Sequence, residues 1–578
     1  MQNYIVHQLS DHFSEELDAH FEVKSAYYTL FNKLVLHEVF LKDQNGDSLL
    51  FAQKVSGRLR FLDLRDRELY FKKLLLDSAN IHLQNDTTKP INVKFLVEAL
   101  RRKDTTKPRM HIRCNNFQIN HSKLTYHSNR TDENAQRFDI NHMVLNNFNI
   151  EARNLNVDSG NVAVDIQQLS FKESCGLELL DLQTEFRLNK KQLAVKNTKF
   201  QTPYSFIQTD SIILHHNHYN NFENPVNTLT LNIAVNESNL GFKDLGYFFN
   251  AFRDMPEQNF VLSGKIHGTL DNLKGEKVYL GTGKQSEIFT DFSLTGLPDI
   301  SKTFMYIDVN HLYTGIEDLD LINSLLSDKN EIVLPGVFRN MGRIEYRGNF
   351  TGFIDDFVAY GKFNTQLGKF STDLLLKPKK TQGLTLEGNL KTRDFNIGGI
   401  LENEKLFGNL SMNIQVNGTI FPDKGFQAHT DGNIENLEVN GYQYKNISLD
   451  GFLTDKQYDG ALSIEDPNIK FSFYGAIDFS KEIPIFDFNA HLEKAKLSKL
   501  NFAKGDTTAR LSFNLISNFK GDYLDNVNGV IMLNQGELIK HNKKLNFENL
   551  QVNAEHIGDT HRIKLRSDHI NAQLVGRY

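Results

Sequence analysis

The sequence of 578 residues contains no tryptophan, only 11 prolines and only two cysteines, Cys114 and Cys175. Two cysteines do not build a disulfide framework, and they neither require nor exclude an oxidising compartment. No run of 18 or more apolar residues is present, so no segment is expected to cross a membrane as a helix. The first residues show no basic segment followed by an apolar one, so the sequence gives no indication of a signal peptide. The net charge of −6 shows no basic excess, which argues against nucleic acid as a partner.

Motifs for catalysis and metal binding are also missing. The sequence has no GxSxG, HExxH or CxxC. The segment Gly281–Lys284 matches a phosphate-binding loop only in part, because Gln285 follows the lysine where Ser or Thr is required, so a turn is expected. His215, His216 and His218 form a cluster in an Asn-rich segment, which favours a solvated loop over a metal site. The sequence therefore predicts no catalytic residue, no metal site, no cofactor and no enzymatic activity.

The dominant positive signal is the alternation of apolar and polar residues along short segments. Side chains of a strand point alternately to opposite faces, so each such segment predicts a strand with one apolar and one wet face. A wet face indicates antiparallel strands, since strands of parallel sheets are apolar on both sides. The apolar members that we expect to line a groove and to contact lipid are Leu410, Met412, Ile414, Val416, Phe471, Phe473, Ile477, Phe479, Phe486 and Phe488.

Glycine repeatedly takes a place among the apolar members, at Gly268, Gly348, Gly388, Gly418 and Gly475. Glycine weakens a strand, but it also lets a sheet bend, so five such positions favour curvature over isolated bulges near turns. Strand patterns return about every 10 to 13 residues, which predicts about forty strands, and a flat open sheet rarely exceeds about ten. We therefore expect a mainly β protein with a long curled antiparallel-type sheet, a β-taco or groove, and a few short helices.

Few segments have the spacing of helices. An amphipathic helix is expected over residues 1–20, and shorter helices are expected over Val93–Lys103 after Asn92, over Leu245–Arg253 after Asp244, and over Asp318–Leu326. In the second of these helices the side chains expected to face inward are Leu245, Phe248, Phe249 and Phe252. The pairs Asn45-Gly46 and Asp431-Gly432 are typical of turns.

Several segments resemble one family, the TamB-like translocation and assembly module proteins of the AsmA-like group, in the form found in Bacteroidetes-type bacteria. The first is Phe21–Phe61, the second pairs Lys243–Phe252 with Ser293–Phe304 and continues into Gly348–Pro378, and the third is Tyr444–Phe479. Together these segments extend over most of the chain.

The resemblance implies a hydrophobic groove that crosses the periplasm of a cell envelope from an inner-membrane anchor. The roles it implies are phospholipid transfer between inner and outer membrane, with acyl chains as cargo, and assembly or export of outer-membrane proteins with an Omp85-type partner. The sequence departs from the family at both ends and is expected to be a fragment that lacks the anchor and the partner-binding domain. Neither contact is therefore assigned to a residue here.

Four regions are expected on these grounds. They are a helix that follows a missing membrane anchor (1–20), an N-terminal AsmA-like β region (21–240), a helix-interrupted β region (241–340) and a continuing β-groove (341–578). The alternative to a lipid-carrying or assembly scaffold is a structural or adhesive cell-surface β-solenoid. Such a solenoid fills its interior with its own side chains and has a strict short repeat, whereas the repeats here differ in length.

Overall fold

The computed structural model describes residues 6, 10–11, 14–15, 17, 19–29, 33–44, 46–63, 68–85, 91–96, 111–128, 137–158, 161–217, 225–321, 337–379, 383–421, 425–503, 505–557 and 560–576. Strands make up 72% of the chain and helices 7%, which confirms a mainly β protein with few short helices. The strands of the described residues number 31 and belong to one mixed sheet. The chain divides into two compact units, Met1–Ile300 and Ser301–Tyr578, and the boundary falls within the region expected at 241–340.

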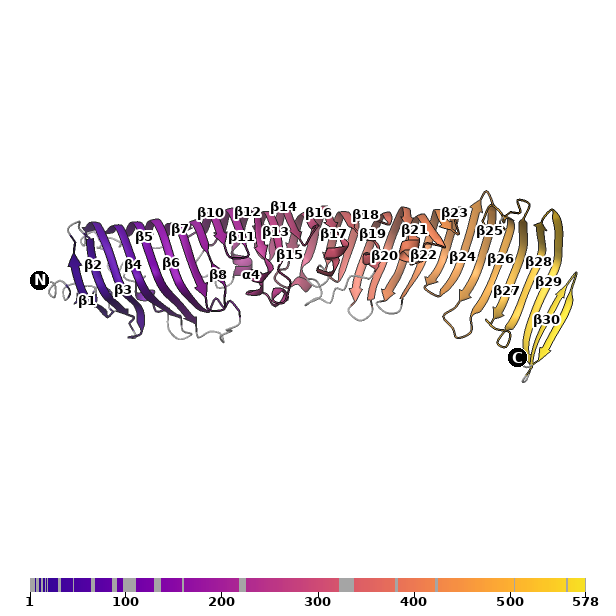
Figure 1. Cartoon of the computed structure of the whole chain (residues 1–578), viewed down its shortest axis with the longest axis horizontal. Helices are drawn as coiled ribbons and strands as arrows, with labels where there is room; N and C mark the ends of the chain where they lie inside the picture. Colours follow the sequence, from indigo (N-terminus) through magenta and orange to yellow (C-terminus); the bar gives the residue numbers. More distant parts are fainter. Residues whose placement is uncertain are drawn as a thin grey trace. The chain divides into compact units, whose positions relative to one another are not determined.

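The first unit contains fifteen strands in its described part (Figure 1). Each strand pairs with the next in antiparallel fashion, except that β4 and β5 are parallel and that β7 pairs with both β8 and β9. The strands are β1 (Phe21–Tyr28), β2 (Lys33–Lys42), β3 (Ser48–Asp63), β4 (Glu68–Asn85), β5 (His111–Ser128), β6 (His142–Asp158), β7 (Asn161–Glu173), β8 (Glu178–Leu179), β9 (Asp181–Leu188), β10 (Gln192–Gln201), β11 (Phe206–His215), β12 (Thr230–Gly241), β13 (Asn259–Gly268), β14 (Asn272–Thr282) and β15 (Ser286–Thr295).

The second unit contains sixteen strands in its described part, each antiparallel to the next. The strands are β16 (Phe304–Thr314), β17 (Ile344–Phe353), β18 (Asp356–Thr365), β19 (Gly368–Lys379), β20 (Gly383–Asn396), β21 (Phe407–Phe421), β22 (Gly425–Val439), β23 (Tyr442–Thr454), β24 (Gln457–Asp466), β25 (Ile469–Asp478), β26 (Ile485–Lys496), β27 (Arg510–Lys520), β28 (Asn528–Lys540), β29 (Lys543–Ile557), β30 (Thr560–Ser567) and β31 (Asn571–Gly576).

The strands are fewer and longer than the forty expected, because bulges and glycines bend them without ending them. Ser78 has a φ of 53° inside β4, which nevertheless runs for 18 residues. The pair Asp431-Gly432, expected to form a turn, lies in the middle of β22, where Gly432 is opposite Ile414 on one side and Leu449 on the other. That turn prediction was wrong. The turn expected over Gly281–Lys284 is confirmed for Gly283 and Lys284, whereas Gly281 and Thr282 still belong to β14.

Helices in the described residues are short. They comprise α3 (Pro225–Thr228), α4 (Phe242–Gly246), α6 (Val337–Asn340), α7 (Ile397–Ile400) and the 3-10 turns η2 (Asn250–Phe252) and η3 (Ile300–Lys302). Residues 94–96 and 316–321 are also helical, and the remainder of these two expected helices lies largely outside the described residues. Of the expected N-terminal helix, the described residues 6, 10–11, 14–15 and 17 are helical. No helix of the described chain is both long and apolar enough to cross a bilayer.

The prediction for Leu245–Arg253 was wrong in two respects. The helix begins at Phe242 and breaks into α4 and η2, and Asp244 lies inside it, where the carboxylate accepts hydrogen bonds from the Thr202 and Ser205 hydroxyls. The buried aromatic residue is Phe242, which is fully buried, whereas Phe248 and Phe249 of the expected inward stripe are 44% and 57% exposed. The hydrogen bonds that the buried Asp244 carboxylate accepts from the two hydroxyls outweigh the intrinsic preference of aspartate for a helix N-cap.

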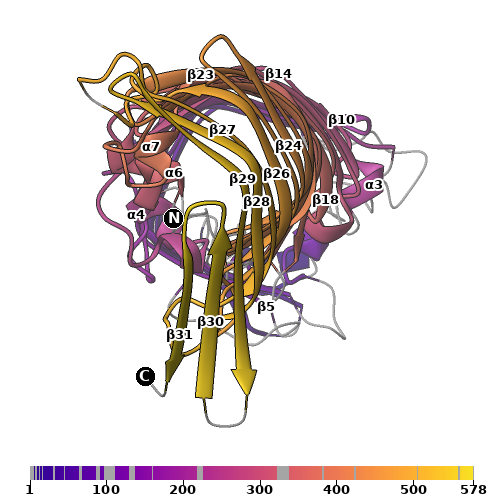
Figure 2. The same cartoon turned by 90° about the vertical axis from the view of Figure 1, so that its right-hand side faces the viewer.

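The sheet of the second unit is curved. Strands β24, β26 and β28 follow arcs in Figure 2, and α6 and α7 lie at one end of the strands. In β25, Phe473 is 9% exposed whereas its neighbour Tyr474, on the opposite face, is 69% exposed. A single flat layer would expose both faces alike, so the sheet bends toward the face that carries Phe473. The curled sheet expected from glycine placement is therefore observed in this unit.

Candidate functional site

The apolar face of the second unit is built from rows of residues that are directly opposite one another on successive strands. One row crosses β20 to β27 and consists of Leu390, Ile414, Gly432, Leu449, Leu462, Phe473, Ala490 and Leu515. A parallel row consists of Leu386, Gly418, Ala428, Leu453, Tyr458, Ile477, Phe486 and Phe519. Because the register is continuous, the alternation in each strand adds up to one apolar surface.

Hydroxyl groups within this surface are satisfied by neighbouring backbone. Thr392 Oγ1 donates to the carbonyl of Leu410 at 3.0 Å, and Ser517 Oγ donates to the carbonyl of Phe486 at 2.9 Å. Thr430 Oγ1 donates in the same way to the carbonyl of the facing strand. A hydroxyl whose proton is already donated presents little polarity to a ligand, so the surface remains apolar where threonine and serine interrupt it.

Burial on this face changes from one end of the strands to the other. At the end that carries α7, which we call the lid end, Leu410 is 4% and Ile447 is 4% exposed. At the opposite end, which we call the hairpin end, Ile420 and Phe426 face each other across β21 and β22 and are each 37% exposed. Between the ends, Ile414 and Phe473 are 8% and 9% exposed, whereas Met412 and Val416 are half-buried. The apolar face is therefore covered at one end of the strands and accessible at the other.

The cover at the lid end is the segment 497–509, which we call the lid and which is described except for residue 504. Leu500 is 1% exposed and packs with Tyr444, Ile447, Leu492 and Ala495 of β23 and β26. The two ends of the lid are joined by a hydrogen bond from the amide of Leu497 to the carbonyl of Ala509, at 3.0 Å. The lid is thus part of the packed structure and covers the apolar face at the lid end of β23 and β26.

Asp506 holds the lid to the next turn. Its carboxylate accepts hydrogen bonds from the Thr508 hydroxyl at 2.6 Å, the Thr508 amide at 3.0 Å and the His541 amide at 2.7 Å. The hydrogen bonds from the Thr508 hydroxyl and the His541 amide lower the pKa of Asp506 to about 2. The lid is therefore fastened at neutral pH by a fully ionised side chain.

Nine of the ten residues expected to line a groove lie in β21, β25 and β26 on the apolar face. Ile477 is directly opposite Phe486, and the rings of Phe473 and Phe488 are 5.0 Å apart. Phe479 instead follows the last residue of β25, is 54% exposed and contacts Phe486 with a ring distance of 5.5 Å. The structure thus brings the residues of β25 and β26 together, while those of β21 lie four strands away.

Sequence reasoning missed the lid. The segment KAKLSKLNFAKG (residues 494–505) has too few apolar residues for a core helix and no strand alternation. The available signal was the spacing of Leu497 and Leu500 in a lysine-rich connection between two clear strands. That pattern indicates a turn with one apolar side, but it does not show that this side packs on the sheet.

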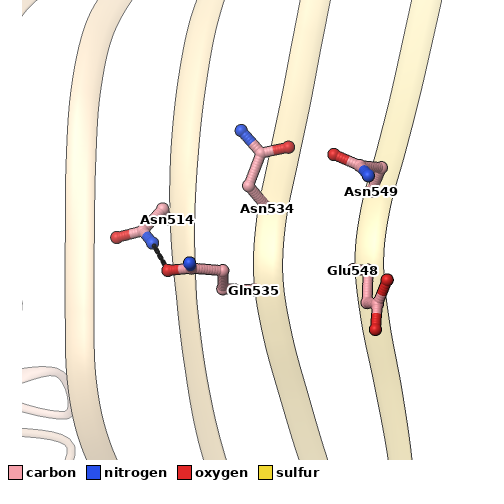
Figure 3. Close-up of a pocket in the computed structure, with 5 residues that line it drawn as sticks. All are labelled: Asn514, Asn534, Gln535, Glu548 and Asn549. Atoms are coloured by element: carbon pink, nitrogen blue, oxygen red, sulfur yellow. Dashed lines mark hydrogen bonds between the residues drawn. The ribbon is translucent and has the colours of Figure 1, made fainter.

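A pocket of about 580 Å³ lies on β27, β28 and β29, and Figure 3 shows its lining. The lining residues are Asn514, Asn534, Gln535, Glu548 and Asn549. Asn514 Nδ2 donates to Gln535 Oε1 at 2.8 Å. The lining is made of amides and one carboxylate and contains no nucleophile or general base partnered for catalysis. We assign no activity to it.

The two cysteines and the histidine cluster offer no reactive group. Burial raises the pKa of the Cys114 thiol, and burial together with Glu173 raises the pKa of Cys175 to about 11, so neither forms much thiolate near neutral pH. His215 ends β11, and His216 is 3% exposed, contrary to the solvated loop expected; His218 lies outside the described residues. The described residues contain no group of three or more potential metal ligands.

No protein-family model, no curated protein and no solved structure matches the chain.

Proposed function

We propose that the apolar face of residues 301–578 binds acyl chains and carries phospholipids, without enzymatic turnover. The observation that supports this most is the half-buried state of a continuous apolar surface: Met412, Val416, Ile477, Phe486 and Phe488 retain exposed area while their polar neighbours face the other way. Transfer of an acyl chain from water to such a surface is favourable by about 0.8 kcal/mol per buried methylene. The accessible hairpin end leaves room for the polar head group to stay hydrated.

A β-solenoid of structural or adhesive function is the alternative. Its interior would be filled by its own side chains and would be close-packed, with most core residues nearly fully buried. Although Ile414 and Phe473 are buried, Met412, Val416 and Leu462 of the same face are only half-buried, which favours the lipid-carrying function over this alternative.

The cellular setting is part of the proposal. The resemblance of Phe21–Phe61, Gly348–Pro378 and Tyr444–Phe479 to TamB-like proteins of the AsmA-like group supports a place in the periplasm of a cell envelope. On that basis we infer phospholipid transfer between the two membranes, assembly or export of outer-membrane proteins, or both. Attachment to the inner membrane and contact with an Omp85-type protein belong to the proposal through this resemblance alone, and we assign neither contact to residues of this chain.

The test measures lipid bound by the purified chain, by native mass spectrometry and by uptake of a fluorescent fatty acid. Val416→Asp and Ile477→Asp each place a charge on the half-buried apolar face. An acyl chain bound there would remove water from the unpaired charge, so its binding should be weakened. Gln415→Asp and Ser472→Asp are matched controls, because they add the same charge on the exposed opposite face of the same strands. We expect the first pair to lose fatty-acid uptake with circular dichroism and melting retained, and the controls to bind as the wild type does.

Two outcomes would contradict the proposal. One is that the wild-type chain takes up neither phospholipid nor fatty acid. The other is that Val416→Asp and Ile477→Asp unfold the second unit outright, which would mean that these side chains pack on one another as a dry core.

A further inference from the structure

Cations gather at the lid end of β26 to β29 without acidic partners. Lys496, Lys499, Arg510, Lys540 and Lys543 are all exposed. Among the residues that the structure describes, none of the five makes an ion pair, whereas nearby Lys470 and Lys544 pair with Glu493 and Glu537. The whole chain carries a net charge of −6, so this local positive charge is not a general property of its surface. We call these five cations the basic rim.

The arrangement of the basic rim is unfavourable for folding. Lys496 is directly opposite Arg510 across β26 and β27, and Lys540 is directly opposite Lys543 across the turn of β28 and β29. Like charges directly opposite each other destabilise an antiparallel pair. A position that costs stability and contacts no acid is better explained by an anionic partner than by the fold itself.

Phe502 is the apolar counterpart of the basic rim. It is 65% exposed, on the same lid whose Leu500 is buried in the apolar face. Its backbone is held, because its amide donates to the carbonyl of Leu497 at 2.9 Å and the side chain of Asn501 donates to the carbonyl of Asn440 at 2.9 Å. The ring is therefore presented to solvent by a structured turn.

We propose that the basic rim and Phe502 dock on the surface of an anionic phospholipid bilayer. Cations adjacent to a large apolar side chain are the pattern of an interfacial anchor, in which the ring enters the boundary of head groups and acyl chains while the cations meet the lipid phosphates. The cations are spread over four strand ends and the lid instead of lining a pocket, which suits an extended charged surface better than a single acidic peptide. The docking does not depend on acyl chains entering the apolar face.

The test is co-sedimentation of the purified chain with vesicles of phosphatidylcholine alone and of phosphatidylcholine with about a third phosphatidylglycerol. We expect binding to the anionic vesicles only, and its loss in high salt. Lys496→Gln with Arg510→Gln should weaken binding by about 25-fold, at about fivefold for each cation near an anionic surface. Phe502→Ser should weaken it by about tenfold if the ring is buried in the boundary region.

The matched control is Lys456→Gln with Lys520→Gln, which removes two exposed cations from the hairpin end of the same unit. This variant should bind as the wild type does. Equal binding to neutral vesicles, equal loss in the control pair, or displacement of the chain from vesicles by polyglutamate at micromolar concentration would each overturn the proposal, the last in favour of an acidic protein partner. Failure of fatty-acid uptake with vesicle binding intact would contradict the carrier function and leave this docking surface standing.

Discussion

Glycine and aromatic residues act together on the apolar face. A Cβ atom on Gly475 would lie 2.3 Å from the carbonyl oxygen of Asp487 and 2.6 Å from the Cα of Phe488, the residue directly opposite. At Gly361 the neighbour is instead a ring: a Cβ atom there would lie 2.3 Å from Cε2 of Tyr346, whose hydroxyl donates to the carbonyl of Tyr360 at 3.0 Å. A ring that covers a glycine restores the packing that the glycine gives up, so the strands bend without losing cohesion.

The placement of glycine on one face was predictable from the sequence, but its conformation was not. Gly388 and Gly475 were expected among apolar residues and are found there, with φ values of 140° and 133°. Gly432 also lies among apolar residues in the structure, but the aspartate before it makes the local sequence look like a hairpin turn. Whether such a glycine lies in a strand or in a turn is decided by its pairing with distant residues, here Ile414 and Leu449, and this pairing cannot be read from the sequence.

Protonation of Asp506 is expected to release the lid. Its folded pKa of about 2 lies below the value of about 3.9 in an unfolded chain, so the carboxylate stabilises the lid above about pH 4 and this contribution is lost as the pH falls through 2. We expect the amides of Thr508 and His541 to be equally protected from hydrogen exchange at pH 7 and pH 4, relative to intrinsic rates, and less protected near pH 2. Asp506→Asn should show reduced protection at all three values; an unchanged titration in this variant would contradict the assignment.

At the scale of the elements, the two ends of the strands in the second unit are constructed differently. Loops at the lid end bond to one another: the amide of Gln366 donates to Met341, that of Asn440 to Leu406, and the side chain of Asn501 to Asn440. Connections at the hairpin end are bonded as well, since the amide of Phe479 donates to Lys456 and that of Gly521 to Pro484. The two ends differ in burial: Leu500 of the lid is 1% exposed, whereas Ile420 and Phe426 at the hairpin end are each 37% exposed. The apolar face is therefore covered along one end, and access for a ligand is expected at the other.

Leu500 is expected to carry most of the attachment of the lid. Leu500→Ala should cost about 2–4 kcal/mol in the free energy of opening the lid, since a leucine that is 1% exposed leaves a cavity when truncated. Hydrogen exchange of the Phe502 and Ala503 amides measures this opening. Ile420→Ala, at the 37% exposed hairpin end, should cost about 1 kcal/mol or less. Equal effects of the two substitutions would mean that the lid end is not the more tightly packed one.

The sequence predicted elements well where a single periodicity controls them. The strands around Met412 and Phe473 followed from alternation alone, because one wet and one apolar face is all that a single-layer sheet requires. The helix at Asp244 and the lid at Leu500 depend instead on contacts with distant strands, through Thr202 and Ser205 in one case and Tyr444 in the other. Such tertiary contacts override local preference and are not visible in a window of sequence.

At the scale of the molecule, contacts between strands join neighbours in the chain. In the described residues, every strand pair with extensive contacts consists of consecutive strands, apart from β7 with β9, which are separated by the two-residue β8. Among the described strands, none makes extensive contacts with a strand distant in the chain, so such contacts do not support a strand that a substitution weakens. Stability should therefore be a sum of local terms, as in repeat proteins, and a substitution should weaken only the unit that contains it.

Reciprocal glycine substitutions test this expectation. Gly475→Ala lies in the second unit and Gly268→Ala in the first, and in each the new Cβ would approach a backbone carbonyl oxygen, at 2.3 Å and 2.1 Å, with φ values of 133° and 117° that disfavour alanine. We expect a loss of about 1–3 kcal/mol in the free energy of unfolding in each case, confined to one unit.

Urea unfolding followed by hydrogen exchange and mass spectrometry assigns each unfolding transition to the peptides that take part in it. Gly475→Ala should shift the transition of residues 301–578 and leave that of residues 1–300, Gly268→Ala should do the reverse, and Ser472→Ala, on the exposed face of β25, should shift neither. A single transition that moves as a whole in all peptides with either glycine variant would show that the units unfold cooperatively, and the local account of stability would then be wrong.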